Sequence, residues 1–239
     1  MTDPADNSSA DVRRGGLTRG DIVESALAMV SDEGIAAVTM RRLADKIGVT
    51  PMALYHHVPN KGVLLDLVVE QVGADLRLAH DGRHWIEQIR SYALQWRDVL
   101  HSYPGVAGYL LRQEAPPAMA WRIIDDAVSL MVEAGFDERQ ATRAYAGLVS
   151  FVLARCDQEE VISKHAAAAE AKAEAKGAPA AGSADDDLTD DRIRARLTVA
   201  HSNVDLGRVA SYLSELSADE HFTYMLDCML AGIDAESHG

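Results

Sequence analysis

Residues 50–61 read Thr-Pro-Met-Ala-Leu-Tyr-His-His-Val-Pro-Asn-Lys (TPMALYHHVPNK), and they predict one short helix with a defined start and end. Thr50 is a favoured N-cap residue, and Pro51 falls at the first helical position, where a missing N–H costs nothing. Pro59 prevents the helix from continuing, and Asn60 can cap the next one. The segment therefore predicts a helix of about two turns, followed closely by another helix.

The predicted helix has little apolar surface. Leu54 and Val58 lie four residues apart and share one face, where they can anchor the helix to a core. The side chains left outside are those of Pro51, Met52, Tyr55 and His56. A helix this short and this polar is costly to maintain unless its outer face has a use. A surface helix of a small bundle is the alternative interpretation.

Metal binding, catalysis and DNA contact could each use these side chains, and the spacing favours DNA contact. His56 and His57 are adjacent, so on a helix they point about 100° apart, and no Cys, Asp or Glu lies three or four residues from either. Nucleophilic catalysis needs a base that a third group orients, and the sequence nominates none. DNA contact uses what is present, namely a helix N-terminus, a tyrosine hydroxyl, histidines, and Lys61 at the start of the next helix.

The residues before this segment predict two more helices. Thr39 can cap a short helix that ends at Gly48. Farther upstream, Thr18 and Asp21 fit a capping box, and Gly34 is placed to end that first helix. The apolar residues expected inside are Ile22, Val23, Ala26, Leu27 and Val30, then Leu43 and Ala44, then Leu64, Leu65, Val68 and Val72. Two short helices joined by a glycine turn indicate a helix-turn-helix.

Charge is distributed unevenly along the chain. The net charge of the 239 residues is −14, which by itself argues against a nucleic-acid partner. Residues 39–61 nevertheless carry a local charge of +3, which leaves −17 on the remainder. The charged side chains of this region are Arg41, Arg42, Lys46 and Lys61, against the acid Asp45. A small basic region on an acidic body favours a protein that contacts DNA through that region alone.

The remainder of the chain is helical in pattern almost throughout, so the predicted fold class is all-α. Amphipathic helices are expected near residues 85–102, 106–113, 119–134, 137–156 and 204–233. Residues 163–187 are of low complexity and lack large apolar side chains, which predicts a flexible insert whose Ala-Glu-Lys part forms a solvated helix. No run of about 18 apolar residues exists, which argues against a membrane span.

The ends of the chain and its cysteines set the expected compartment. Residues 1–16 are polar and lack the apolar core of a secretion signal, so they predict a disordered arm. Cys156 and Cys228 form neither a disulfide framework nor a metal-ligand spacing. A reducing cytoplasm is therefore the simplest setting, and neither a metal nor another cofactor is expected.

Residues 17–69 resemble the DNA-binding domain of the TetR (tetracycline repressor) family. The matching residues are Ala26, Gly34, Thr39-Met40-Arg41-Arg42-Leu43-Ala44, Gly48-Val49, Leu54-Tyr55-His56-His57-Val58 and Asn60-Lys61. The form LYHHVPNK resembles the branch that contains the tetracycline repressor itself, and Trp85 and Gly135-Phe136 agree with that branch. The resemblance implies a three-helix DNA-binding domain at residues 17–69 and a helical regulatory and dimerisation domain at residues 70–239.

For DNA, the resemblance implies a homodimeric repressor that binds a double-stranded operator. By motif position, the residues expected to face bases or nearby sugars are Thr39, Arg41, Thr50, Pro51, Met52, Ala53 and His56. Those expected to hold phosphates are Tyr55, His57 and Lys61. Arginine pairs bidentately with guanine, and proline or methyl groups contact thymine methyls.

For the C-terminal domain, the resemblance implies a small-molecule pocket. Aromatic and polar residues at helical spacing are the candidates, although such spacing equally suits a core. They are Arg77, Tyr92, Trp96, Tyr109, Arg112 and Trp121. The tetracycline repressor holds a drug–magnesium complex through histidine and asparagine, and the positions we align with these carry Arg77, Tyr92 and Leu110. The expected effector is therefore a bulky, partly apolar or aromatic molecule without a metal.

Two other functions stay open at this point. One is a DNA-binding regulator whose pocket is filled by its own side chains. The other is a helical ligand carrier or an enzyme with a chance helix-turn-helix, although no catalytic residue can be nominated. Binding to DNA from around its own gene would distinguish the last class from the first two.

Overall fold

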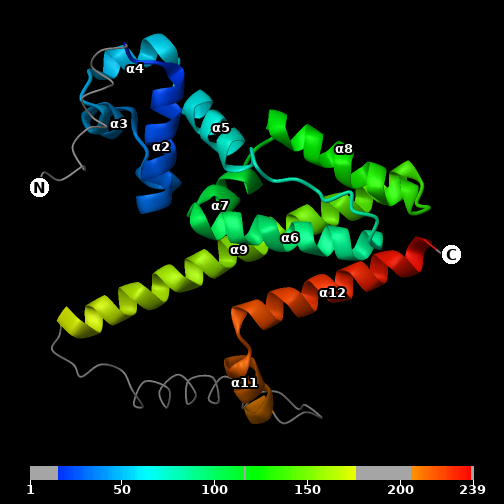
Figure 1. Ribbon diagram of the computed structural model, residues 1–239. Helices are drawn as coiled ribbons and strands as arrows, with labels where there is room; N and C mark the ends of the chain where they lie inside the picture. The colour runs from blue at the N-terminus through cyan, green and yellow to red at the C-terminus, as the bar shows by residue number, and fades with distance from the viewer. Residues whose placement is uncertain (1–15, 116, 176–205, 238–239) are drawn as a thin grey trace, which may run out of the picture. The chain divides into compact units, whose positions relative to one another are not determined.

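The computed structural model describes residues 16–115, 117–175 and 206–237 (Figure 1). The regular elements of these ranges are α-helices and one 3-10 turn, without a strand, so the predicted all-α class is confirmed. The described residues form two units, one within residues 1–157 and 233–239 and one within residues 158–232. Within the described ranges, no helix is both long enough and apolar enough to cross a bilayer.

The N-terminal elements begin and end where the local sequence predicts. They are α2 (Arg19–Glu33), the 3-10 turn η1 (Ile35–Ala37), α3 (Met40–Ile47), α4 (Pro51–His57) and α5 (Lys61–Val72). Thr18 and Asp21 form the reciprocal capping box of α2. The next three helices are each capped by a side-chain oxygen that accepts from a backbone N–H three residues later. Thr39 accepts from Arg42 at 3.2 Å, Thr50 accepts from Ala53 at 3.3 Å, and Asn60 accepts from Val63 at 2.9 Å.

These helices close around a small apolar core. α2 packs against α3, η1 and α5, and α3 packs against α4. Leu43, Leu54 and Leu64 supply fully buried side chains from three different helices. Gly48 ends α3 with φ of 82°, a left-handed conformation that glycine adopts without strain. The α3–glycine–α4 arrangement is the predicted helix-turn-helix.

Four more helices of the first unit follow in the chain. They are α6 (Trp85–Ser102), α7 (Val106–Leu111), α8 (Ala118–Glu133) and the first part of α9 (Glu138–Ala175). Trp85 meets Phe136 edge to face, with ring centroids 5.1 Å apart, which joins the start of α6 to the α8–α9 turn. Asp137 and Gln140 cap each other's backbone N–H at the start of α9, at 2.8 and 2.9 Å.

A close backbone contact joins the helix-turn-helix part to α6 and α7. The Ile35 N–H donates to the Pro104 carbonyl at 2.8 Å. Gly105 follows with φ of +83°, and a Cβ there would lie 2.7 Å from Ile35 Cγ2. The turn between α6 and α7 therefore needs glycine for its conformation and for its approach to η1.

The C-terminal helices differ from the prediction in one place. Residues 163–175, the Ala-Glu-Lys part of the expected insert, are helical as predicted and continue α9, and residues 163–172 are exposed. The single helix predicted at 204–233 is two, α11 (Leu206–Glu215) and α12 (Ala218–Ser237). Ser217 explains the break, because its hydroxyl and backbone exchange hydrogen bonds with Glu220 as a capping box that starts a new helix. Residues 1–15 and 176–187 of the predicted arm and insert lie outside the described residues.

Candidate DNA-binding face and effector cavity

The residues predicted to contact DNA lie on the surface of α3, α4 and the start of α5. Nine of the ten are exposed, and Ala53 is half-buried. Met52 keeps 66% of its surface in solvent and Tyr55 keeps 46%, although both belong to a helix whose Leu54 is completely buried. An apolar and an aromatic side chain held outward on a seven-residue helix indicate a face that a partner covers.

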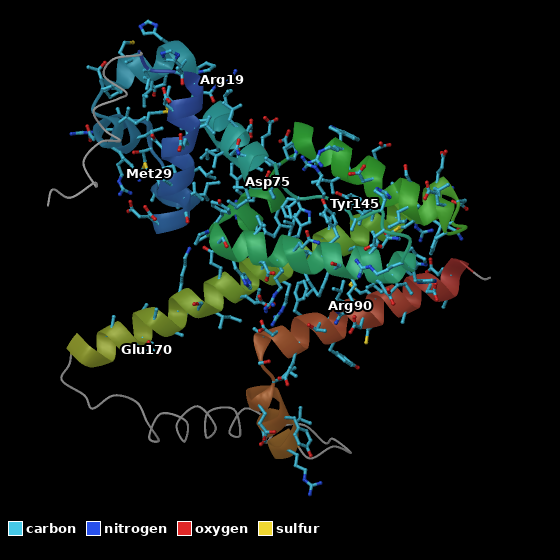
Figure 2. The ribbon with its side chains drawn as sticks, in the orientation of Figure 1. Arg19, Met29, Asp75, Arg90, Tyr145 and Glu170 are labelled. Atoms are coloured by element: carbon cyan, nitrogen blue, oxygen red, sulfur yellow. The ribbon has the colours of Figure 1, made fainter. Side chains whose placement is uncertain are left out.

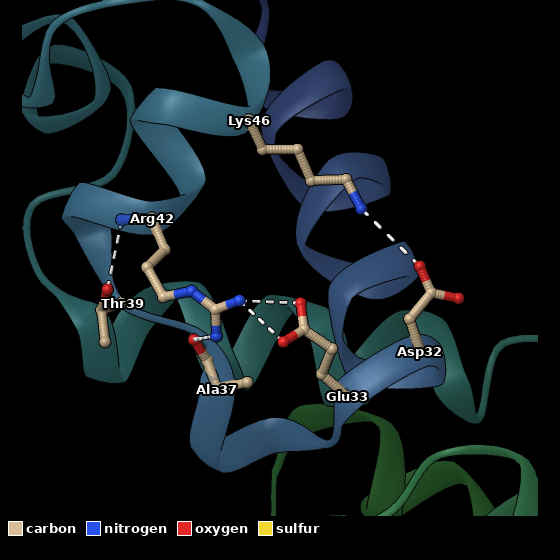
Figure 3. Close-up of polar contacts among 6 residues, drawn as sticks. All are labelled: Asp32, Glu33, Ala37, Thr39, Arg42 and Lys46. Atoms are coloured by element: carbon tan, nitrogen blue, oxygen red, sulfur yellow. Dashed lines mark hydrogen bonds and ion pairs between the residues drawn. The ribbon is translucent and has the colours of Figure 1, made fainter.

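The predicted basic region is smaller than its sequence suggests (Figure 3). Arg42 donates to both carboxylate oxygens of Glu33, at 2.7 and 2.8 Å, and to the Ala37 carbonyl at 3.1 Å. Lys46 lies 3.8 Å from Asp32. Two of the four cations of residues 39–61 therefore pair with α2 or the turn that follows it. This pairing of Arg42 was not predicted from the sequence, although the acids Asp32 and Glu33 at the end of α2 are the signal that could have shown it.

Arg41 and Lys61 remain available for DNA. Both are exposed, and neither forms a hydrogen bond or ion pair with any described residue. Lys61 is the first residue of α5, and Thr50 precedes α4, so each lies at a helix N-terminus where backbone N–H groups favour phosphate. The face can supply one arginine for base recognition and one lysine for the backbone.

The histidines of α4 do not form a metal site in this structure. Among the residues that the structure describes, no group of three or more His, Cys, Asp and Glu side chains is placed to hold an ion. His56 and His57 are both exposed in the last turn of α4. Their accessible ring nitrogens are suited to hydrogen bonds with DNA.

A cavity of about 390 Å³ lies among α6, α7, α8 and α9, within the first unit. Its lining is mostly apolar, with Tyr92 and Trp96 from α6 and Tyr145 from α9, which Figure 2 labels. Small residues at lining positions, Ala93 on α6 and Ala127 on α8, leave space that larger side chains would fill. Protein interiors are normally close-packed, so a hollow of this size is suited to a small molecule.

Two lining tyrosines are held protonated. Burial, and secondarily Tyr92, raises the pKa of Tyr145 to about 12. Burial also raises the pKa of Tyr92, although the indole N–H of Trp96 donates to the Tyr92 hydroxyl and partly opposes this. Sequence reasoning placed Tyr145 on a helix stripe and missed it as a cavity residue.

Of the six predicted effector residues, Tyr92 and Trp96 line the cavity and four do not. Arg77 donates to the carbonyls of Ala74 and Leu76 instead. Trp121 is 61% exposed on the outer side of α8, because helical spacing predicts a face but not which neighbour covers it. The other two are Tyr109 and Arg112, which belong to the α7 region without lining the cavity.

Tyr109 forms a contact that the sequence did not predict. Its hydroxyl donates to Asp66 Oδ1 of α5 at 2.8 Å. Partial burial, followed by the hydrogen bond and charge of Asp66, raises the pKa of Tyr109 to about 12. The next two residues, Leu110 and Leu111, line the cavity. One helix of six residues therefore contacts both the cavity and the helix that starts at Lys61.

A helix-turn-helix with an exposed outer face, joined to a helical part that encloses a cavity, is the architecture of a DNA-binding regulatory protein. The family described as "Bacterial regulatory proteins, tetR family" matches residues 22–68, and "Tetracyclin repressor-like, C-terminal domain" matches residues 78–237. The chain belongs to the TetR family of transcriptional regulators, as the sequence resemblance predicted.

Individual relatives show the extent of the similarity. Tetracycline repressor protein class D of Escherichia coli is 31% identical over 148 residues, which are 60% of this chain and 67% of that protein. The TetR family protein ActR of Streptomyces coelicolor, in complex with actinorhodin, has a TM-score of 0.73 at 22% identity and shares the fold over 93% of this chain and 97% of its own. BioQ with its double-stranded DNA operator has a TM-score of 0.57 at 30% identity, over 61% of this chain and 89% of its own.

Proposed function

We propose that the protein is a homodimeric repressor that binds a palindromic operator and releases it when a small molecule fills the cavity. One observation carries the ligand response. α7 supplies Leu110 and Leu111 to the cavity wall and bonds through Tyr109 to Asp66 of α5. A molecule that displaces α7 therefore acts directly on α5.

The DNA half of the proposal uses the exposed face of α3, α4 and the start of α5. Arg41 reads a base edge, and Lys61 and Tyr55 hold phosphates, with the remaining predicted residues around them. A homodimer presents two such faces, which fit successive major grooves when they lie about 34–36 Å apart. A two-fold symmetric protein then requires a palindromic operator. Because DNA is the partner, the cytoplasm is the proposed compartment.

The dimer is proposed from apolar side chains exposed in the second unit. They are Val161, Ile162, Tyr212, Leu216, Tyr224 and Met225. Large side chains of this kind, exposed on α9, α11, α12 and the link between the last two helices, favour burial against a second copy of the chain. The acidic remainder of the chain then keeps the dimer soluble and away from unspecific contact with DNA.

Release follows from the position of α5 in the chain. Asp66 lies five residues after Lys61, or about 7.5 Å along the helix axis, so a shift of α7 is transmitted over a short distance. Arg122 of α8 adds a second connection, since it donates to the Leu76 carbonyl at 3.2 Å just after α5. A ligand switches the protein only if it binds the displaced arrangement better, by about 5.5 kcal/mol for a full switch.

Names of the relatives support each half of the proposal. A tetracycline repressor supports repression, a BioQ complex with an operator supports double-stranded DNA as the partner, and an ActR complex with actinorhodin supports a small-molecule ligand. The open cavity favours a ligand-responsive regulator over one whose pocket is filled by side chains.

The proposal is tested with the purified full chain and labelled DNA from around its own gene. We expect saturable binding to one palindromic site, a dimer by light scattering, and release by a compound that binds the protein. By linkage, operator DNA must weaken binding of that compound by the same factor with which the compound weakens binding of DNA. An unchanged affinity for the compound in the presence of operator would exclude the coupling through α7.

A further inference from the structure

We propose that the protein has a second ligand site, a polar cleft at the start of α6 that binds a small organic cation with N–H donors, such as a primary ammonium or guanidinium group. The cleft shares no lining residue with the effector cavity, and the residues that line it all belong to the first unit. The inference goes beyond the proposed function and does not depend on it.

The cleft has a volume of about 450 Å³, which is within the range of small-molecule sites. It is lined by the start of α6 with the residues just before it, by the end of α8, and by Asp234 near the end of α12. The adjacent residues Gln88 and Ile89 of α6 line the cleft and the effector cavity respectively. The two sites therefore lie on different sides of the same helix.

A buried amide in the cleft lining lacks a hydrogen-bond donor. Gln88 is 4% exposed, and its Nε2 donates to the Arg83 carbonyl at 2.7 Å, which fixes the orientation of the amide. The buried Oε1 has no hydrogen-bond partner among the described residues. A buried acceptor without a donor is destabilising, and an amide oxygen can only accept. A ligand that satisfies Gln88 from the cleft must therefore supply a donor.

The charged groups of the cleft favour a cation. Glu133 is exposed and pairs with no described residue. Asp234 supplies a second carboxylate, which also interacts within the chain. Arg83, the one arginine of the described lining, pairs with Asp81 at 2.7 Å, so its charge is balanced. The remaining charge of the cleft is negative, and a donor that is also a cation fits both Gln88 and the carboxylates.

The helix ends at the cleft favour the same sign of charge. Glu133 is the last residue of α8, and the last turn of that helix has no basic residue to balance its C-terminal carbonyls. The start of α6 would favour an anion, but the N–H groups of residues 86–88 already donate to His84, at 3.4, 3.0 and 3.2 Å. Within the described ranges, no three His, Cys, Asp or Glu side chains are placed to hold a metal ion, which favours an organic cation.

The test is a fluorine NMR titration of the full-length protein labelled with fluorotryptophan. Each of the three tryptophans reports a different place: Trp85 lines the cleft, Trp96 lines the effector cavity, and Trp121 is 61% exposed. The probes are benzylamine, benzyltrimethylammonium, benzyl alcohol and benzoate, which share one ring and differ in charge and in donors.

We expect benzylamine to shift the Trp85 signal saturably and to bind about tenfold more tightly than benzyltrimethylammonium, which is a cation without an N–H. Benzyl alcohol, a donor without charge, should bind at least about threefold more weakly than benzylamine, and benzoate should leave the Trp85 signal unmoved. Equal affinities of the two cations, a saturable shift of Trp85 by benzoate, or a Trp85 signal that benzylamine does not move would each overturn the inference. A shift of Trp96 alone would place the amine in the effector cavity and overturn it as well.

Variants assign the binding to the cleft residues. Gln88→Met keeps the length of the side chain and should weaken benzylamine about tenfold, while benzyltrimethylammonium changes by less than about twofold. Glu133→Gln, at an exposed position where folding is not at risk, should weaken both cations by about twofold to fivefold. Glu24→Gln on α2 removes the same charge outside the cleft and should change neither. Unchanged benzylamine affinity in either cleft variant would refute the assignment.

The titration contains no DNA, so its failure is distinguishable from failure of the proposed function. Operator release by a compound in the effector cavity, with no amine bound beside Trp85, would overturn this inference and leave the ligand-responsive repressor standing. Amine binding that depends on Gln88 and Glu133, without any compound releasing operator, would support this inference and remove the proposed response.

Discussion

Tyr109→Phe should make the protein more sensitive to its effector. The substitution removes one hydroxyl that donates to Asp66 at 2.8 Å and leaves the ring in place. A hydrogen bond to a charged group contributes about 1.5–3 kcal/mol. Asp66 is exposed and Tyr109 is only partly buried, so solvent screening reduces the value to about 1 kcal/mol. That energy corresponds to about a fivefold shift toward the displaced arrangement of α5 and α7.

This change in the populations of the two arrangements affects the affinity for operator DNA and the affinity for the effector unequally. While the operator-binding arrangement remains the majority, its population changes little, so operator affinity should fall by less than about twofold. The displaced arrangement becomes about five times more populated, so a compound that releases operator should bind up to about five times more tightly in the absence of DNA. Fluorescence anisotropy of labelled operator and calorimetry of the compound measure the two affinities separately.

Two further variants decide whether the bond itself is responsible. Asp66→Ala should produce the same shift, and the double variant should add nothing, because both changes remove one interaction. Tyr103→Phe, at the end of α6, makes the same chemical change where the structure records no hydrogen bond of the hydroxyl, and should behave as wild type. Additive effects of the Tyr109 and Asp66 variants, or an equal effect of Tyr103→Phe, would refute the coupling.

Four other predictions concern the DNA face, the turn before α7 and the cavity. Arg41→Ala should weaken specific operator binding by about 1–3 kcal/mol and relax one base position, whereas Lys61→Ala should weaken binding to all sequences and reduce the salt slope by about one; equal sequence profiles and salt slopes would contradict the assignment. Arg42→Ala should lower the free energy of unfolding by about 1 kcal/mol without changing the salt slope, because Arg42 pairs within the protein; a reduced slope would show that it contacts phosphate. Gly105→Ala should cost at least about 1–2 kcal/mol of stability in urea unfolding, since φ is +83° and the added methyl meets Ile35; an unchanged midpoint would contradict that geometry. Burial raises the pKa of Tyr145 to about 12 from about 10 in the unfolded chain, so stability is fully present below about pH 10 and falls as the pH rises toward 12; Tyr145→Phe should reduce this fall in unfolding curves measured between about pH 9 and 11.5, and an identical fall would exclude the contribution.

Helix starts and ends were predictable because the groups that fix them are neighbours in the sequence. The caps of α2, α3, α4 and α5 each join residues three positions apart, so the residue types alone reveal them. The same rule was available at Ser217 and Glu220, but the apolar pattern continued across them and suggested one helix. Where a cap and a hydrophobic stripe disagreed, the cap decided the structure.

The cavity was predictable only in part, because its residues come from four helices whose relative rotation the sequence does not state. Tyr92 and Trp96 lie on the inner face of α6, whereas Trp121, with equally suitable chemistry, lies on the outer face of α8. Periodicity shows that a helix has a buried face. It does not show whether a Trp at the border of that face is buried or exposed. Tyr145 was missed for the opposite reason, since a position on an apolar stripe indicated an ordinary core.

The Tyr109–Asp66 hydrogen bond could not be predicted from spacing at all, because its two residues are 43 positions apart. Its position supports the proposal that a six-residue helix serves as the sensor. α7 begins at Gly105, whose left-handed conformation and contact with Ile35 fix that end of the helix against η1. Its other end carries Leu110 and Leu111 on the cavity wall, where a ligand can displace them. A helix that is fixed at its first residue and displaced by a ligand at its last is expected to rotate about the fixed end. Tyr109 lies between the two ends of α7. The substitution of Tyr109 therefore tests the one side-chain bond by which α7 is proposed to act on α5.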